Sequence, residues 1–144
     1  MRRKDEKIVR HQSSKMEVGM KILILGGTYF LGKAFVELAK DVHDLTIINR
    51  GNKRPQFLKN SSIKEYISDR HDISKLSKLK GECFDVLVDF CAYSSGDIRT
   101  VLDALGGKIG QYIFISTCDV YRHGTGKPQD EEAELEDRDF GGEA

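Results

Sequence analysis

The stretch KILILGGTYFLG, residues 21–32, constrains the fold of this chain more than any other. It begins with the composition of a buried strand, and after Tyr29 its apolar residues recur at helical spacing. Gly26, Gly27 and Gly32 stand at the junction. Such a turn either only joins two elements, its glycines allowing a tight bend and close packing, or it holds a phosphate at the N-terminus of the helix. Its place between a strand and a helix favours the phosphate.

Apolar runs alternate with segments of helical spacing along the rest of the chain. We predict strands over 21–25, 45–49, 63–67, 85–89 and 111–116, and helices in the segments 30–39, 73–79 and 98–105. This alternation predicts an α/β fold, a doubly wound parallel sheet that is Rossmann-like and truncated after about five strands. Ligands of such sheets bind beyond the carboxyl ends of the strands, so the site is expected in the segments that directly follow them.

Charge divides the 144 residues into three parts. The whole chain has 23 basic and 23 acidic residues, which gives no electrostatic reason to expect a nucleic acid or a membrane surface as partner. Residues 1–19 are rich in Lys and Arg, whereas the last residues are strongly acidic. We predict a disordered N-terminal extension at 1–19, the Rossmann-like domain at 20–124 and an acidic tail at 125–144.

The cysteines indicate the compartment of the protein, and the histidines indicate whether a metal site is expected. The three cysteines Cys83, Cys91 and Cys118 form no CxxC pair, so we expect a reduced, cytoplasmic protein. The apolar runs are too short for a membrane span or a signal peptide. The four histidines lack metal-ligand spacing, so no metal is expected.

The segments after the second and third strands offer candidates for the adenosine end of a dinucleotide. Asn49 and Arg50 stand where an acidic residue commonly holds the ribose hydroxyls. An arginine suits a 2′-phosphate instead, which favours NADP over NAD, unless Arg50 is only an exposed loop residue. Asp69, Arg70 or Asp72 could border an adenine pocket, or Asp72 could simply cap the next helix.

The segments after the fourth and fifth strands would border the other end of the ligand. Asp89 is costly to bury without hydrogen bonds, so it either ties loops together, which we favour, or faces the cofactor. After the fifth strand, a hydroxyl such as that of Thr117 could polarise a carbonyl or hydroxyl substrate. Cys118 could act as a nucleophile only if its pKa were lowered.

Taken together, ILGGTYFLG, NRG, DRHDI and ISTCDVY, in this order and spacing, resemble the extended short-chain dehydrogenase/reductase superfamily, in its NAD(P)-dependent epimerase/dehydratase group. The resemblance covers about residues 20–144. It implies that Gly26, Tyr29 and Gly32 occupy the positions of the family's three phosphate-loop glycines, with Tyr29 departing from the pattern. It further implies an adenine-contacting pair at Asp72 and Ile73.

The expected cofactor-binding residues combine these arguments: Gly26, Gly27, Thr28, Tyr29, Phe30, Leu31, Gly32, Asn49, Arg50, Asp72, Ile73, Cys91, Ala92 and Tyr93. The resemblance also places Thr117 on the family's catalytic Ser/Thr. The family's Tyr-x-x-x-Lys pair is absent from this chain, because no Tyr follows Tyr121 and no Lys follows Lys127.

The resemblance therefore implies the N-terminal portion of an NAD(P)-dependent enzyme that acts on a sugar nucleotide or a similar carbinol or carbonyl substrate, inactive as this fragment. The alternative is a non-catalytic module of the atypical branch, which senses NAD(P) or binds RNA. The expected partners are a dinucleotide, a small-molecule substrate in the full-length form, and a second copy of the chain. In this homodimer the bare edge strand at 111–116 would lie at or near the interface.

Overall fold

Five parallel strands form one sheet in the order β3-β2-β1-β4-β5. The computed structural model describes residues 19–53, 55–59, 62–106, 108–122, 124, 126 and 128–136. The strands are β1 (Lys21–Leu25), β2 (Asp44–Asn49), β3 (Lys64–Ile67), β4 (Phe84–Asp89) and β5 (Ile109–Phe114). This order confirms the predicted doubly wound parallel sheet, and the direction of winding reverses between β1 and β4.

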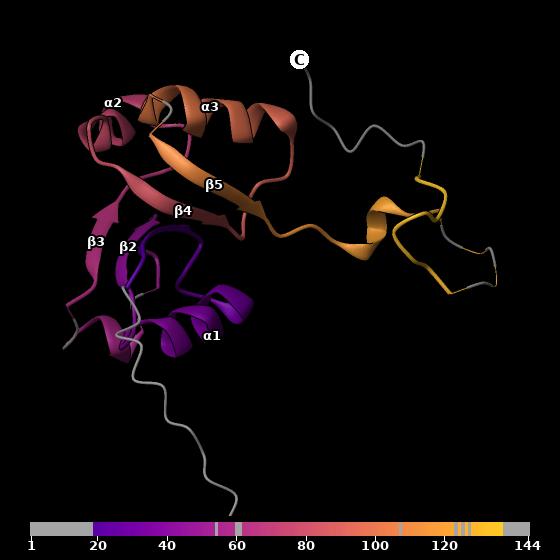
Figure 1. The fold of residues 1–144 in the computed structure, drawn as a ribbon, viewed down its shortest axis with the longest axis horizontal. Coiled ribbons are helices and arrows are strands. Elements are labelled where there is room, and N and C mark those ends of the chain that lie inside the picture. Colours follow the sequence, from indigo (N-terminus) through magenta and orange to yellow (C-terminus); the bar gives the residue numbers. More distant parts are fainter. Residues whose placement is uncertain are drawn as a thin grey trace, which may run out of the picture.

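The helices cover both faces of the sheet. Helix α1 (Phe30–Ala39) lies on one face, and α2 (Ile73–Leu76) and α3 (Ser95–Leu105) lie on the other (Figure 1). Short 3₁₀ turns complete the described elements: η1 (Gln56–Leu58), η2 (Ser77–Leu79) and η3 (Cys118–Val120). The helix predicted over 73–79 is therefore a single α-turn continued by a 3₁₀ turn.

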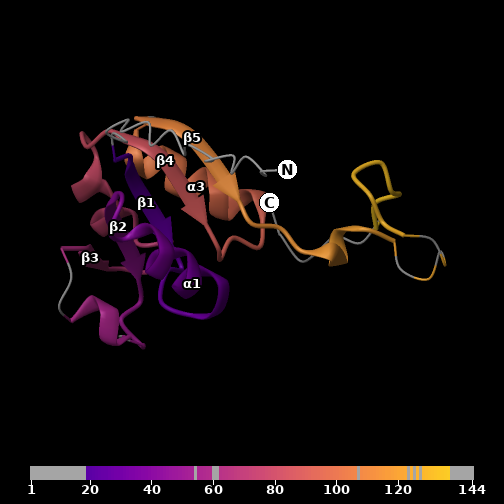
Figure 2. The same ribbon diagram turned by 60° about the horizontal axis from the view of Figure 1, so that its bottom comes forward.

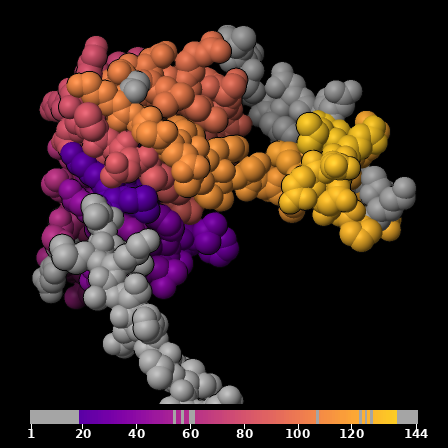
Figure 3. All heavy atoms as spheres, viewed as in Figure 1, coloured from indigo at the N-terminus to yellow at the C-terminus, as the bar shows by residue number. Residues whose placement is uncertain are grey.

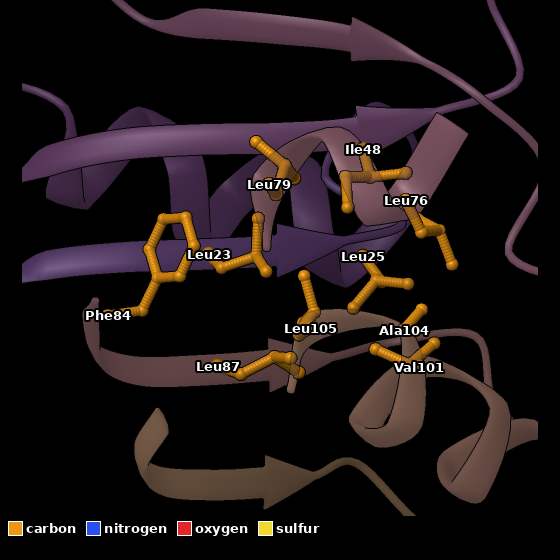
Figure 4. Packing of buried hydrophobic residues seen from close by; sticks show 10 residues of the cluster. All are labelled: Leu23, Leu25, Ile48, Leu76, Leu79, Phe84, Leu87, Val101, Ala104 and Leu105. Carbon is orange, nitrogen blue, oxygen red and sulfur yellow. The ribbon is translucent and has the colours of Figure 1, made fainter. Parts of the chain in front are cut away.

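Two hydrophobic clusters, one on each face, hold the layers together. The first packs β1, β2 and β4 against α2, η2 and α3, as Figure 4 shows for the residues Leu23, Leu25, Ile48, Leu76, Leu79, Phe84, Leu87, Val101, Ala104 and Leu105. The second includes Ile24, Ile47 and Val36 on the α1 side. Successive residues Leu23 and Ile24 thus enter opposite clusters, which explains why the central strands are apolar at consecutive positions.

The last strand starts and ends two residues earlier than predicted, at Ile109–Phe114 instead of 111–116. Its start lies beside β4, where Ile109 pairs with Phe84. A Cβ on Gly110 would lie 2.7 Å from the carbonyl oxygen of Asp85, so this glycine allows a close strand approach and is not a turn. β5 is one of the two edge strands of the sheet, β3 being the other, and its Ile113 and Phe114 are 36% and 41% exposed.

Beyond β5 the described chain runs away from the sheet as an arm (Figures 1 and 2), and Figure 3 shows a narrow neck between the body and this arm. Tyr121 pairs antiparallel with Leu135, and an ion pair of 2.7 Å joins Arg122 to Glu134. The expected boundary at 124/125 falls inside this arm. Residues 1–18 of the expected extension and 137–144 of the acidic tail lie outside the described residues. No helix among the described residues is long and apolar enough to span a membrane.

Candidate functional site

A cleft of about 1000 Å³ opens at the carboxyl ends of the strands. It lies across the point where the strand order reverses, as expected for a ligand site in this architecture. Among the residues predicted for the site, those lining the cleft are Gly26, Thr28, Tyr29, Phe30, Leu31, Gly32, Asn49, Arg50, Cys91, Ala92, Tyr93 and Thr117. Gly27, Asp72 and Ile73 do not line it. Segments far apart in the sequence therefore meet at one cleft.

The glycines of the β1–α1 turn have different roles. A Cβ on Gly32 would lie 2.3 Å from the carbonyl oxygen of Gly26, so α1 can sit this close to the turn only with glycine. Gly26 has a φ of +85°, which favours glycine as well. A Cβ on Gly27 would lie 3.1 Å from side-chain atoms of Ile24 and Val36, so this glycine packs against the core and does not face the cleft.

The N-terminus of α1 faces the cleft without a capping side chain of its own. Its N-cap residue is Tyr29, whose side chain makes no capping hydrogen bond, whereas Asp72 caps α2 and Ser94 caps α3. The first N–H groups of a helix have no partner within the helix, and they carry its positive dipole end. The turn therefore presents uncapped amide donors to the cleft, an arrangement suited to a phosphate.

Two aromatic residues of this turn are exposed at the cleft. Phe30 is 84% exposed and has a φ of +43°, a left-handed conformation that a bulky residue rarely adopts. Tyr29 is 67% exposed, and the Lys53 ammonium lies 3.9 Å from the centroid of its ring. The departure from glycine at Tyr29 thus places a ring and a cation beside the turn, and the strain at Phe30 marks the turn as a functional candidate.

After β2, side-chain contacts of Asn49 define the loop that carries Arg50. Its Nδ2 donates to Glu65 at 2.9 Å and its Oδ1 accepts the N–H of Gly51 at 2.7 Å. Asn49 is therefore used to shape the turn, and Arg50 is the cation that this turn presents to the cleft. Hydrogen bonds from the backbone and ring of His71 lower the pKa of Asp69, and the charge of Arg50 contributes to the same shift. Arg50 and Asp69 consequently lie within electrostatic range of each other.

After β3, the cleft is lined by Ser68, Asp69, Arg70 and His71. Asp72 instead accepts hydrogen bonds from Ser74 and from the N–H of Lys75, as the alternative role of a helix cap predicts. Ile73 is 57% exposed and lies outside the cleft. The rule that ligands bind directly beyond strand ends favours the four lining residues, whereas the resemblance had pointed to Asp72 and Ile73.

A buried ion pair lies at the base of the cleft. Arg70 donates to both carboxylate oxygens of Asp89, at 3.1 and 2.8 Å, and Asp89 is fully buried. The same carboxylate accepts the Tyr112 hydroxyl at 2.5 Å and the N–H of Cys91 at 2.9 Å. Burial raises the pKa of Asp89, but these hydrogen bonds outweigh burial and hold it below its usual value. Asp89 thus ties loops together, the role favoured from the sequence.

Asp97 holds the loop after β4 in a similar way. Its Oδ2 accepts the N–H groups of Tyr93 at 2.8 Å and Ser94 at 3.0 Å, and its Oδ1 lies 2.7 Å from Nε2 of His71. Burial raises the pKa of Asp97, but the backbone N–H of Tyr93 and the other hydrogen bonds lower it to about 2. The loop that carries Cys91, Ala92 and Tyr93 is therefore anchored by two carboxylates.

Cys91 itself is unsuited to nucleophilic chemistry. Burial and the Asp89 carboxylate raise the pKa of its thiol to about 11, so the thiol stays protonated near neutral pH. Thr117, at the β5 side of the cleft, is exposed and accepts the N–H of Asp119 at 3.3 Å through its hydroxyl oxygen. Its O–H can therefore donate to a ligand in the cleft.

Comparison with known proteins shows which solved structures share this fold. No protein-family model matches the sequence, and no curated protein matches it. Solved structures do match. One is a nucleoside-diphosphate-sugar epimerase from Pseudomonas aeruginosa, with 22% identity, a TM-score of 0.63, and coverage of 81% of this chain and 40% of that one. A UDP-N-acetylglucosamine 4-epimerase from Methanobrevibacter ruminantium, in complex with UDP-N-acetylmuramic acid, has 18% identity, a TM-score of 0.68, and coverage of 81% and 44%.

A third match is the enzyme WbmG of Bordetella bronchiseptica in complex with NAD, with 15% identity, a TM-score of 0.69, and coverage of 90% of this chain and 46% of that one. The present chain thus spans less than half the length of these proteins. At such identities the likeness concerns the fold. The chain has a Rossmann-like fold, which is also the fold of these two nucleotide-sugar epimerases and of WbmG.

Proposed function

We propose that the cleft binds NAD(P), and that the chain is the dinucleotide-binding part of an epimerase/dehydratase-type oxidoreductase of the extended short-chain dehydrogenase/reductase superfamily. The observation that carries the proposal is the uncapped N-terminus of α1, brought to the cleft by the packing of Gly32 on Gly26. Uncapped amides and a positive dipole end suit a pyrophosphate. The match to a structure in complex with NAD supports the same assignment.

The flanking residues orient the ligand in this proposal. Arg50 and the residues after β3 receive the adenosine half, and Phe90, Cys91 and Thr117 border the nicotinamide half. In the full-length enzyme, the Thr117 hydroxyl would donate a hydrogen bond to the carbonyl or carbinol oxygen of a sugar nucleotide. The similarity in fold to two nucleotide-sugar epimerases supports that substrate class.

The first prediction concerns the choice between NADP and NAD. NADPH is expected to bind more tightly than NADH, because the Arg50 guanidinium can meet the 2′-phosphate. Since a hydrogen bond to a charged group is worth about 1.5 to 3 kcal/mol, Arg50→Ala should weaken NADPH binding by about 10- to 100-fold and leave NADH nearly unchanged. Titration calorimetry with both dinucleotides measures this difference.

Two variants sharpen this test. Arg99→Ala removes an exposed arginine of α3 outside the cleft lining and should change neither affinity. Asp69→Asn removes the negative charge near Arg50 and should strengthen NADPH binding, because a carboxylate repels a phosphate. Equal affinities of the unmodified protein for NADPH and NADH would contradict the assignment of Arg50, and no affinity for either would contradict the proposed function.

We further propose that the chain forms a homodimer through β5. This strand is a sheet edge, and a sheet edge offers unpaired backbone groups to another strand. Light scattering at tens of micromolar should give twice the mass of one chain. Ile113→Lys should give a monomer, because it places a charge beside that edge, whereas Leu38→Lys, at a position of α1 that is 83% exposed, should not. A monomeric unmodified protein would refute the dimer.

A further inference from the structure

The ring of His71 lies between two carboxylates on the wall of the cleft. Its Nε2 is 2.7 Å from Oδ1 of Asp97, and its Nδ1 is 3.1 Å from Oδ1 of Asp69. The side chain is nevertheless 62% exposed, and it lines the cleft beside Arg70. His71 is therefore both hydrogen-bonded and accessible to a ligand.

The neighbouring Arg70 has one N–H group that this arrangement leaves unused. Its side chain is only 9% exposed, and its buried Nε has no hydrogen-bond partner among the described residues. The nearby acceptor is the same Oδ1 of Asp97, at 3.8 Å, which is too far for a hydrogen bond. Two nitrogen atoms thus face one carboxylate oxygen, and only Nε2 of His71 lies within hydrogen-bond distance of it.

A shift of about 1 Å would bring this oxygen within the usual 2.9 Å of the Arg70 Nε. The other oxygen of Asp97 stays held by the N–H groups of Tyr93 and Ser94, so the carboxylate can turn towards Arg70 without releasing the loop after β4. If His71 left Asp97, the buried N–H of Arg70 would gain the partner it lacks. Because an unsatisfied buried donor is costly, this gain offsets part of the cost of releasing His71.

The backbone of the loop does not depend on the position of the His71 ring. The N–H of His71 donates to Oδ1 of Asp69 at 2.9 Å, and the N–H of Asp72 donates to the carbonyl of Asp69 at 3.1 Å. Arg70 is fixed separately by Asp89. The ring can therefore swing while the loop stays in place.

On the basis of the proposed dinucleotide site, we infer that His71 is a ligand-binding residue for the adenosine half of NAD(P), and that it exchanges Asp97 for the ligand while Arg70 Nε takes over the vacated oxygen. The adenosine half is assigned because His71 follows β3, beside the Arg50 loop that follows β2. The imidazole offers that half a hydrogen-bonding nitrogen and a stacking face.

The unmodified chain tests this directly by NMR. Adding NADPH or adenosine 2′,5′-bisphosphate should shift the imidazole signals of His71, and adding nicotinamide mononucleotide should not. The Nε–H proton of Arg70 should move downfield and exchange more slowly with water when either adenosine ligand binds. His43, which accepts the N–H of Met20 at the other end of the sheet, is the internal control and should not respond.

A substitution gives the matching affinity test. His71→Ala should weaken binding of NADPH and adenosine 2′,5′-bisphosphate by about 3- to 10-fold, the value of one ordinary hydrogen bond. Its Arg70 Nε–H should already show the bonded signature without ligand, because Asp97 is free to accept it. His43→Ala should change neither property.

The outcomes separate this inference from the function on which it rests. If NADPH shifts the signals of Gly26 and Gly32 but leaves His71 and the Arg70 Nε–H unchanged, the inference is wrong and the dinucleotide site stands. If NADPH and NADH shift no signal of the chain, both are wrong. If His71→Ala fails to fold, the ligand titrations of the unmodified chain still decide the question.

Discussion

Replacing Asp89 with alanine is expected to lower the free energy of unfolding by about 3 to 5 kcal/mol, the usual cost of removing one partner from a buried ion pair. Arg70 would be left charged, with its side chain 9% exposed and its main acceptor gone. The Tyr112 hydroxyl and the N–H of Cys91 would lose the same acceptor. Urea unfolding followed by circular dichroism measures the loss.

Two further variants show whether the charge is responsible. Asp103→Ala removes an exposed aspartate of α3 and should change the free energy of unfolding by less than about 0.5 kcal/mol. The double variant Arg70→Met with Asp89→Leu should recover the part of the loss that is due to the unpaired charge of Arg70, because apolar pairs of similar volume often replace buried ion pairs without cost. The Tyr112 hydroxyl and the N–H of Cys91 still lack their acceptor in this variant. A loss below about 1 kcal/mol for Asp89→Ala would show that Arg70 finds another partner.

The sequence predicts the elements whose signals are local. A helix cap was one of the two roles expected for Asp72, and its side chain makes the capping hydrogen bond to the N–H of Lys75. The doubly wound parallel sheet was expected from the alternation of strands and helices, because right-handed crossovers leave few arrangements. The displaced start of β5 was missed because Gly110 resembles a turn residue until its contact with Asp85 is seen.

The candidate site was only partly predictable, because the sequence shows local signals and not contacts between residues far apart in the chain. The β1–α1 turn is continuous in sequence, so its glycines and the residues around them could be identified together. The contacts of Arg70 with Asp89 and of His71 with Asp97 join residues 19 and 26 positions apart. The spacing of apolar residues in the sequence cannot predict such contacts. They depend on the three-dimensional position of the loop after β3 relative to the N-terminus of α3.

The second large effect is expected at Gly32, where the fold and the proposed site depend on the same contact. In Gly32→Ala the new Cβ would meet the carbonyl oxygen of Gly26 at 2.3 Å, and the carbonyl carbon of Gly26 and Cα of Gly27 at 3.1 and 3.2 Å. All three are backbone atoms, so no side chain can move aside and α1 itself must shift. Overpacking of this kind typically costs about 1 to 3 kcal/mol of stability.

The same shift should weaken NADPH binding by about 10- to 100-fold, since moving α1 withdraws at least one N–H from the pyrophosphate and each such charged hydrogen bond is worth about 1.5 to 3 kcal/mol. Gly96→Ala is the matched control, because a Cβ there would meet only Ser94 Oγ, at 3.6 Å. Alanine within α3 should instead stabilise the protein by about 0.5 to 1 kcal/mol and leave the affinity unchanged.

Calorimetric titration and urea unfolding of both variants measure the two effects. A Gly32→Ala variant that binds NADPH as tightly as the unmodified protein would show that the α1 N-terminus does not contact the pyrophosphate, and the observation that carries the proposed function would then fail.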